Sequence, residues 1–364
     1  MALIEDNGLR IEWPDMSAGD GPGPAAAPRR RVLVVKLSSL GDLFHALPAV
    51  HALKTGLDAE VHWVTQPAYA DLVPCFADVS RVIVFDRQGF PAGFRRFVRE
   101  LRRDSYDCVV DLQGLLKSAL VTRLARGRER IGPSFHREGA ALFYSRVAGT
   151  RRKDRHAVEE NLDVARALGL ECGAPVFPVR FGACSVVAPR PRIAVMPVSR
   201  WASKNWPADA FVRALRRVRD ALPSATFFLL GGRADAAVCV AIAAATGGST
   251  ANLTGRTTLV QMGSLLGQMD LVLSNDSGPM HMAAATGVPV LALFGPTDPK
   301  RTGPFGPGHR VLTAGELECR PCFCARCRFG ATRCMEGLAP EAVAEAMLAM
   351  LGAKNTPKHC GGEG

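Results

Sequence analysis

The sequence is poor in aromatic residues and has no long apolar segment. Only 7% of its residues are Phe, Trp or Tyr, too few to line a surface on which nucleic-acid bases stack. No apolar run reaches the roughly 18 uncharged residues that a membrane-spanning helix needs. A histidine-paired finger motif is also missing. These absences argue against a nucleic-acid-binding protein and against an integral membrane protein.

The sequence also lacks the marks of an exported, disulfide-bonded protein. Residues 1–29 are rich in Gly, Pro, Ala and acidic residues without the basic and then apolar layout of a secretory signal, so we expect a disordered tail. Residues 353–364 are expected to form a second tail. The 11 cysteines are odd in number and partly scattered, which fits a reducing cytoplasm better than a disulfide framework.

What is present is a soluble, basic, two-domain composition. A chain of 364 residues is longer than one typical core supports. Apolar residues make up 48% and charged residues 22%, as in globular proteins. The net charge of +11 indicates an anionic partner, which could be nucleic acid, a phosphorylated substrate or a membrane surface.

Strands and helices alternate in both halves of the chain. The run at 31–37 is almost unbroken in β-branched residues, as expected of a parallel strand covered on both faces. Further strands at 60–64, 81–85 and 106–112 and a helix at 154–168 predict a doubly wound α/β domain. We place this domain at 30–181, a linker at 182–191 and a second such domain at 192–352.

Asp42 lies at the opening of the helix that follows the first strand. The positive end of the helix dipole keeps a carboxylate ionised there, and such a carboxylate can act as a general base. An ordinary helix cap is the alternative for a lone Asp. Ser38, Ser39 and Gly41 are candidate substrate-binding residues of the same loop, which has too few glycines for a dinucleotide fingerprint.

The segment 270–299 reads as strand, tight turn, small-residue helix and second buried strand. The turn Asn275-Asp276-Ser277-Gly278 precedes a helix, predicted at 277–286, whose first amides attract phosphate oxygens. His281 falls one turn into this helix and can reach the same anion. A helix cap and a buried core histidine are the alternative interpretations. Another strand, at 192–196, precedes Ser199 and Lys204, and Lys204 can neutralise a diphosphate.

Three motifs together resemble glycosyltransferase family nine, the ADP-heptose:lipopolysaccharide heptosyltransferases. They are VLVVKLSSLGDLFHALPAV, SKNWP and SNDSGPMHMAAATGVPVLALFGPTDP. The first is closest to type I enzymes, which add the first heptose to the Kdo sugar of the inner core. The resemblance implies a GT-B fold, in which two Rossmann-like doubly wound domains face a central cleft.

The resemblance also implies an inverting reaction without a catalytic metal. The base would be Asp42, and the diphosphate-neutralising lysine would be Lys204. The remaining donor contacts would be Ser199, Asp276, Ser277, Gly278 and His281. The donor would be ADP-heptose, and the acceptor would be Kdo-lipid A or the inner core.

Such an acceptor would also explain the basic first half of the chain. The helix FRRFVRELRR places apolar residues on one face and five arginines on the others. We expect the apolar face to pack on the sheet and the arginines to meet an anionic leaflet. The predicted location is cytoplasmic, peripheral on the inner face of the inner membrane. The alternative interpretation of the arginines is a basic face that contacts only solvent.

Five cysteines are bunched in the segment 319–334, which we call the Cys-rich segment. Two CxxC pairs and one more cysteine suffice for a structural Zn or Fe site. The chosen ligands are Cys319, Cys322, Cys327 and Cys334. Reduced thiols in a surface loop are the alternative.

Other functions stay open. One alternative is a family relative that heptosylates a protein or uses another nucleotide sugar. An alternative of another class is a basic nucleic-acid-binding protein with a cysteine cluster, although no nucleic acid is expected as a partner.

Overall fold

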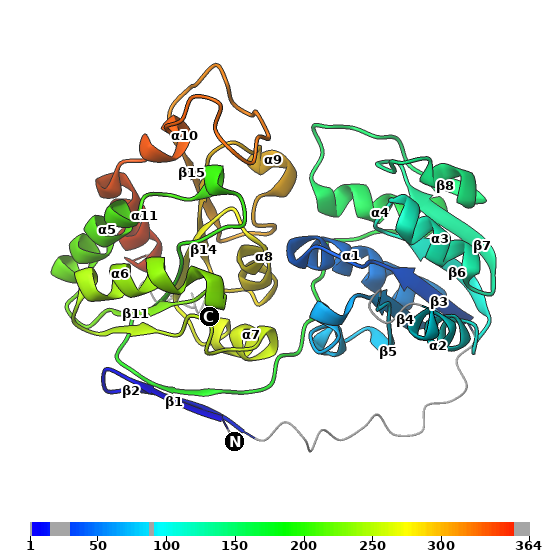
Figure 1. Cartoon of the computed structure of the whole chain (residues 1–364), viewed down its shortest axis with the longest axis horizontal. Coiled ribbons are helices and arrows are strands. Elements are labelled where there is room, and N and C mark those ends of the chain that lie inside the picture. The colour runs from blue at the N-terminus through cyan, green and yellow to red at the C-terminus, as the bar shows by residue number, and fades with distance from the viewer. Residues whose placement is uncertain (1, 15–29, 87–90, 353–364) are drawn as a thin grey trace, which may run out of the picture. The chain divides into compact units, whose positions relative to one another are not determined.

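The structure is a computed structural model that describes residues 2–14, 30–86 and 91–352 (Figure 1). The chain divides into two compact units. The first, called the N-terminal domain, comprises Ser17–Phe181 and Lys300–Thr302. The second, called the C-terminal domain, comprises Met1–Met16, Gly182–Pro299 and Gly303–Gly364.

The N-terminal domain is built on a six-stranded sheet with the order β5-β4-β3-β6-β7-β8. All neighbouring strands pair in parallel. Its strands are β3 (Arg30–Val35), β4 (Ala59–Thr65), β5 (Val79–Val84), β6 (Tyr106–Asp111), β7 (Gly127–Pro133) and β8 (Arg146–Ala148). Its helices are α1 (Leu40–Leu57), α2 (Ala92–Leu101), α3 (Leu116–Leu124) and α4 (Ala157–Ala167), with 3-10 turns η1 (Pro67–Tyr69), η2 (Val73–Cys75) and η3 (Ala140–Phe143).

The C-terminal domain contains a second six-stranded parallel sheet, with the order β12-β11-β10-β13-β14-β15. Its strands are β10 (Arg192–Met196), β11 (Thr226–Leu229), β12 (Thr250–Asn252), β13 (Leu271–Asn275), β14 (Val290–Phe294) and β15 (Arg310–Thr313). Its helices are α5 (Ala208–Ala221), α6 (Ala236–Thr246), α7 (Leu259–Leu266), α8 (Gly278–Ala285), α9 (Pro299–Thr302), α10 (Arg333–Glu336) and α11 (Pro340–Gly352), with η4 (Ala202–Lys204) and η5 (Arg233–Asp235). Of these helices α9 is divided, because Pro299 belongs to the C-terminal domain and Lys300–Thr302 belong to the N-terminal domain.

Both sheets have the strand order 3-2-1-4-5-6 of a dinucleotide-binding fold when their strands are numbered within each domain. The order reverses between β3 and β6 in one domain and between β10 and β13 in the other. Ligands of open α/β sheets bind outside the carboxyl ends of the strands at such a point. This topology decides which loops can form a site.

Each sheet is buried by apolar side chains on its helices. In the C-terminal domain, Phe211 and Leu215 of α5 and Met347 of α11 are fully buried against the sheet. In the N-terminal domain, Phe97 and Leu101 of α2 are 4% and 0% exposed and belong to the core. The prediction that the apolar face of this basic helix packs on the sheet is therefore confirmed.

The start of the chain differs from the prediction of a disordered tail. β1 (Ala2–Asp6) and β2 (Leu9–Trp13) form an antiparallel hairpin. Asn7 and Gly8 between them have φ values of 49° and 75°, the backbone that an Asn-Gly hairpin turn requires. Acidic residues alternate with apolar ones here, and the composition concealed that alternation. The rest of the predicted tail, 15–29, and the predicted tail 353–364 lie outside the described residues.

The predicted linker also contains regular structure. β9 (Ser185–Val187) lies within 182–191 and pairs antiparallel with β2, which completes a three-stranded sheet. Its extended backbone supplies the pairing partner that the hairpin needs. Among the described residues, no helix combines the length and the apolar character needed to cross a bilayer.

Candidate active site

The first candidate cluster lies in the loop that joins β3 to α1 in the N-terminal domain. The loop leaves the carboxyl end of β3 beside β6, at the point where the strand order reverses. It carries the predicted residues Ser38, Ser39, Gly41 and Asp42, of which Gly41 is buried and the others are partly exposed. The predicted residues of this domain thus lie at the sheet edge where open α/β folds bind ligands.

Asp42 is held by the residue that begins its helix. Its Oδ2 accepts hydrogen bonds from the backbone N–H and the hydroxyl of Ser39, at 2.9 and 2.7 Å. His45 Nδ1 lies 4.0 Å from Oδ1, and the Asp42 side chain is 46% exposed. The carboxylate therefore caps α1 while it is still accessible to a ligand. Capping and base catalysis are compatible, because Ser39 donates both capping bonds to one oxygen of a carboxylate that is half exposed.

Two residues that the sequence analysis missed make hydrogen bonds that hold this loop in place. Gln113 Oε1 accepts the N–H groups of Leu37 and Ser38, at 3.1 and 3.0 Å. Lys36 Nζ donates to the carbonyl of Leu112, at 2.6 Å. Both supports follow the carboxyl ends of the central strands β3 and β6. This shared position could have indicated both residues, but only to a reader who already knew the strand order.

Below the loop lies a buried polar network. Burial lowers the pKa of Lys36, and the charges of Asp42 and Asp111 oppose that shift. Asp111 is fully buried, and burial raises its pKa. Its oxygens accept from the hydroxyl of Tyr144 and the N–H of Gln113, both at 2.7 Å. The loop that carries Asp42 is thus anchored on groups that have few alternative positions.

The second candidate cluster lies in the C-terminal domain and centres on Asp276, which directly follows β13. Lys204 Nζ is 2.6 Å from its Oδ2, and the hydroxyl of Thr297 donates to the same oxygen at 2.5 Å. The side chains of Asp276 and Lys204 are only 5% and 16% exposed. The Lys204 ammonium also lies 4.7 Å from the ring centre of Trp201. This lysine is therefore tightly positioned before any ligand binds.

Hydrogen bonds tie the loop after β10 to the loop after β13. The hydroxyl of Ser199 donates to the carbonyl of Asp276 at 2.8 Å, and the Ser199 N–H donates to Asn205 Oδ1 at 2.7 Å. Asn275 Nδ2 donates to the carbonyl of Pro197 at 2.6 Å. Ser199 and Asp276, which the sequence analysis singled out separately, are thus joined at the reversal point of this sheet.

The turn after Asp276 leads into α8. Helix α8 begins at Gly278, one residue after the predicted start, and Ser277 is its N-cap. The Ser277 side chain makes no capping hydrogen bond, and its Oγ lies 3.2 Å from Ser274 Oγ. His281 in the first turns of α8 is 7% exposed. Because the N-cap side chain does not bond to the first amides, this helix start has the form of an anion site.

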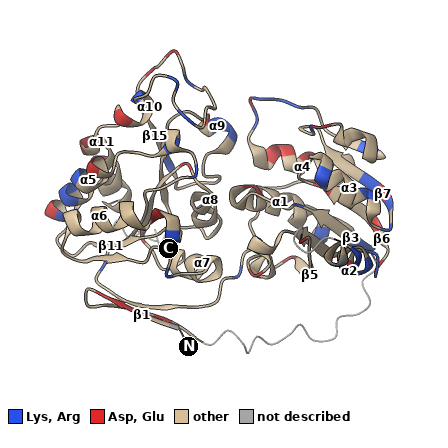
Figure 2. Ribbon diagram, in the orientation of Figure 1, with Lys and Arg blue, Asp and Glu red and all other residues tan. Residues whose placement is uncertain are grey.

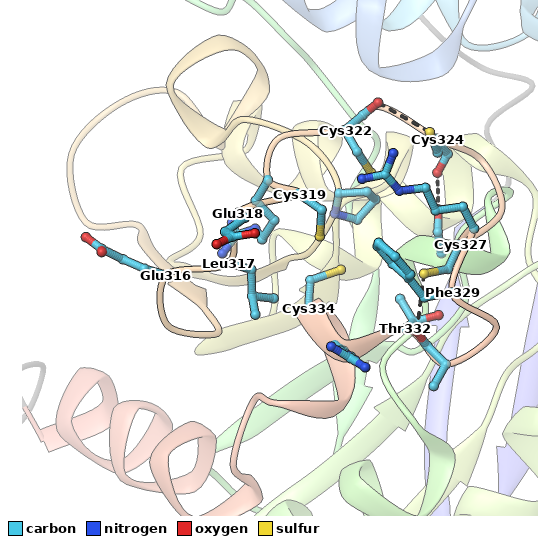
Figure 3. Close-up of a pocket in the computed structure, with 16 residues that line it drawn as sticks. Glu316, Leu317, Glu318, Cys319, Cys322, Cys324, Cys327, Phe329, Thr332 and Cys334 are labelled. Atoms are coloured by element: carbon cyan, nitrogen blue, oxygen red, sulfur yellow. Dashed lines mark hydrogen bonds between the residues drawn. The ribbon is translucent and has the colours of Figure 1, made fainter.

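The Cys-rich segment forms a cavity of about 720 Å³ that all five of its cysteines line (Figure 3). Its thiols do not converge on one point. Cys327 Sγ donates to the carbonyl of Ala331 at 3.2 Å, and Cys324 Sγ donates to the carbonyl of Cys322 at 3.4 Å. Within the described part of the chain, no three or more His, Cys, Asp or Glu side chains are placed so that they could hold a metal ion together. The predicted Zn or Fe site therefore has no support, and of its four chosen ligands Cys327 donates to a backbone carbonyl. Its chosen ligands were Cys319, Cys322, Cys327 and Cys334.

Several solved structures of glycosyltransferases share this two-domain architecture. The chain is similar to the structure titled E. coli heptosyltransferase WaaC with ADP, with 26% identity and a TM-score of 0.73. The similarity covers 88% of this chain and 99% of that one. The fold is therefore an α/β GT-B fold of two Rossmann-like domains.

The family is equally clear. The sequence pattern of glycosyltransferase family 9 (heptosyltransferase) matches residues 94–332. The chain is 28% identical to lipopolysaccharide heptosyltransferase 1 of Pseudomonas aeruginosa, over 90% of this chain and 99% of that protein. It is 31% identical to lipopolysaccharide heptosyltransferase 1 of Salmonella typhimurium, over 79% and 95%. The chain belongs to glycosyltransferase family 9 and is a glycosyltransferase.

Proposed function

We propose that this enzyme transfers L-glycero-D-manno-heptose from ADP-heptose to the Kdo region of the lipopolysaccharide inner core, with inversion at the anomeric carbon. The names of its type 1 relatives support the lipopolysaccharide heptosyltransferase activity. The observation that carries the donor assignment is the convergence of Lys204 and Thr297 on Asp276 beside the start of α8.

Lys204 would stabilise the ADP leaving group. Its ammonium is held by Asp276, so little side-chain entropy is lost when a diphosphate arrives. The amides at the start of α8 and the ring of His281 would share the negative charge that develops on the diphosphate. Ser199, which hydrogen bonds to the Asp276 backbone, would keep the two phosphate-facing loops in register. No metal ion takes part in this scheme.

Asp42 would act as the general base on the acceptor. One of its oxygens accepts both bonds from Ser39, which orients a carboxylate that is 46% exposed, so that it can take the proton of an attacking sugar hydroxyl. That hydroxyl would attack the anomeric carbon from the face opposite ADP.

Turnover of ADP-heptose with Kdo2-lipid A tests the proposal, with the Asp42→Asn variant beside the wild type. Loss of a positioned base is expected to lower kcat by roughly 10²–10⁴-fold while the affinity for ADP stays unchanged. Asp58→Asn, at the other end of α1, is the matched control and should retain full activity.

Three results would count against this function. They are turnover by Asp42→Asn at the wild-type rate, retention of configuration in the product, and transfer only to a protein or only from another nucleotide sugar. The last result would favour the alternative family activities.

We also infer that α2 brings the enzyme to an anionic membrane surface at the inner face of the inner membrane. Five exposed arginines lie on α2 and the turn after it, and Figure 2 shows basic residues on this helix. They are Arg95, Arg96, Arg99, Arg102 and Arg103. A second basic segment, at 151–155, contributes less, because Arg152 pairs with Asp154 and Arg155 pairs with Asp163.

Vesicle binding tests this inference. Replacing Arg95 and Arg99 by Ala should weaken binding to vesicles that contain anionic phospholipid, by about 1 kcal/mol per arginine at most, and should raise the KM for the lipid acceptor. Replacing Arg213 and Arg217 of α5 by Ala removes equal charge from the C-terminal domain and is the matched control. Equal binding by both double variants would contradict a role for α2.

A further inference from the structure

The Cys-rich segment is hydrogen bonded to the loop that carries Thr297. The N–H groups of Cys322 and Phe323 both donate to the carbonyl of Pro296, at 3.0 and 2.9 Å. Pro296 directly precedes Thr297, whose hydroxyl donates to Asp276. A movement of the backbone at Cys322 is therefore transmitted to one of the two groups that hold the Asp276 carboxylate.

The same segment is hydrogen bonded to the loop that carries Lys204. The hydroxyl of Ser203 donates to the carbonyl of Cys324 at 2.6 Å, and the Ser203 N–H donates to the carbonyl of Ala325 at 3.3 Å. Ser203 is 2% exposed and directly precedes Lys204. A movement at Cys324 is therefore transmitted to the other group that holds Asp276.

Hydrogen bonds of their backbone thus connect Cys322 and Cys324 to the same site, the Asp276 cluster. The contact through Cys322 leads to Thr297 and the contact through Cys324 leads to Lys204, and both of these residues bond to Asp276 Oδ2. Only one residue, Phe323, separates the two cysteines. The geometry of this three-residue turn and the geometry of the Asp276 cluster are consequently linked.

The two thiols belong to one exposed three-residue turn. Both cysteines are exposed, and their side chains lie at the rim of the cavity in Figure 3, where a dashed line joins Cys324 Sγ to the Cys322 carbonyl. Phe323 between them has a φ of 53°. This left-handed turn shortens the separation of the flanking Cα atoms toward the roughly 4.4–6.8 Å that disulfides span.

We propose that Cys322 and Cys324 form a thiol-modification site, which a low-molecular-weight disulfide converts into an intrachain disulfide that weakens nucleotide binding at the Asp276 cluster. The link to nucleotide binding rests on the proposed donor site. The thiol chemistry itself does not depend on it.

The chemistry is ordinary thiol–disulfide exchange. One thiolate attacks a sulfur of the small disulfide, which forms a mixed disulfide and releases one thiolate of the reagent. The second cysteine loses its proton and attacks the protein sulfur of the mixed disulfide, which releases the other thiolate. Two cysteine thiols are oxidised by two electrons, and one reagent disulfide is reduced to two thiols.

Closure must rotate the turn, because the Cys324 thiol donates to the Cys322 carbonyl at 3.4 Å and has to turn from that oxygen to the Cys322 sulfur. The backbone groups of Cys322 and Cys324 that rotate are those bonded to Pro296 and Ser203. Misplacement of one charge-assisted contact costs enough to weaken ADP binding by roughly tenfold.

Oxidation of the purified full chain with glutathione disulfide tests the proposal. Peptide mapping by mass spectrometry identifies the bonded cysteines, and calorimetric titration measures ADP affinity before oxidation, after it and after dithiothreitol. We expect a Cys322–Cys324 disulfide, roughly tenfold weaker ADP binding and full recovery on reduction. Cys322→Ser should keep its ADP affinity under oxidation, whereas Cys327→Ser, which removes another thiol of the same cavity, should respond like the wild type.

A disulfide mapped to other cysteines, or unchanged ADP affinity once the Cys322–Cys324 disulfide has formed, would overturn the proposal. Failure of the reduced protein to bind ADP would contradict the proposed donor site instead. Peptide mapping would then still decide for or against the thiol site.

Discussion

At the scale of single residues, one carboxylate oxygen organises the proposed donor site. Asp276 Oδ2 accepts from both Lys204 and Thr297. A nearly buried carboxylate with two strong donors keeps a fixed orientation. Asp276 thus fixes the position of the Lys204 ammonium, and the Thr297 hydroxyl fixes the position of the Asp276 carboxylate.

Thr297→Val tests this arrangement, because valine has the same shape but cannot donate to Asp276. Without the hydroxyl, Asp276 and Lys204 gain freedom, and we expect ADP binding to weaken by roughly tenfold. Isothermal titration of ADP provides the measurement. Thr313→Val, on an exposed position at the end of β15, is the control, and equal effects of the two changes would contradict the positioning role.

Asp163 predicts a pH dependence of stability. Burial alone would raise its pKa, but hydrogen bonds from Arg155 at 2.7 and 2.9 Å and from Arg166 at 3.0 Å outweigh burial and lower it. Because the folded-state pKa lies below the unfolded value of about 3.9, the stabilisation is present above that value and is lost as pH falls through the folded-state pKa.

We therefore expect Asp163→Asn to reduce the free energy of unfolding by about 1–3 kcal/mol at pH 7. The difference from the wild type should shrink as denaturant titrations are repeated at successively lower pH, below about 4. Asp154→Asn removes an exposed acid near the start of α4 and should leave stability close to wild type. A difference for Asp163→Asn that stays constant with pH would refute this account.

At the scale of elements, each domain positions its site with a loop that leaves a central strand and is held by the neighbouring strand. In the N-terminal domain the loop after β3 is held by Gln113, which follows β6. In the C-terminal domain the loop after β10 is held by Asn275 at the end of β13. A side-chain amide thus ties the two loops at the reversal point in both domains.

Gln113→Ala tests the support of the Asp42 loop. The N–H groups of Leu37 and Ser38 lose their acceptor, so the base should be less well placed, and we expect kcat to fall by roughly tenfold or more. ADP affinity should not change, because the proposed nucleotide site belongs to the other domain. Gln66→Ala, a partly buried glutamine of the same domain, is the control. A loss of ADP affinity equal to the loss of kcat would mean that the substitution acts by unfolding the protein.

At the scale of the whole molecule, the first residues of the chain belong to the domain built from its second half. The hairpin β1–β2 pairs with β9, and Asp6 accepts from the N–H of Asn252 at 2.9 Å. Asn7 Nδ2 donates to the carbonyl of Thr250 at 2.8 Å. Trp13 at the end of β2 is 2% exposed. Residues separated by most of the sequence therefore share one folded unit.

Trp13→Ala should consequently destabilise the C-terminal domain. Truncation of a buried tryptophan costs about 3–5 kcal/mol, so we expect the calorimetric transition of this domain to move to lower temperature while that of the N-terminal domain stays in place. Leu3→Ala on the same hairpin is the control, because Leu3 is 44% exposed. A shift of the N-terminal transition alone would contradict the assignment of the hairpin.

The sequence by itself determined the two α/β domains and the placement of the site residues at strand ends. Alternating apolar runs specify parallel strands and covering helices, and a polar turn after a buried strand lies at the sheet edge wherever that strand sits. The apolar face of α2 was equally predictable from its spacing. Asp42, Lys204 and Asp276 could therefore be singled out from local pattern alone.

Only the tertiary structure decided which of these residues meet. The strand order places β10 beside β13, and that neighbourhood brings Lys204 to Asp276. The same kind of adjacency reveals Gln113, Thr297 and the contacts of the Cys-rich segment, and it turns a predicted tail into a paired hairpin. The spacing of residues along the chain reports only local periodicity. Strand order and the hydrogen bonds of the Cys-rich segment depend on contacts between distant residues, which local periodicity does not encode.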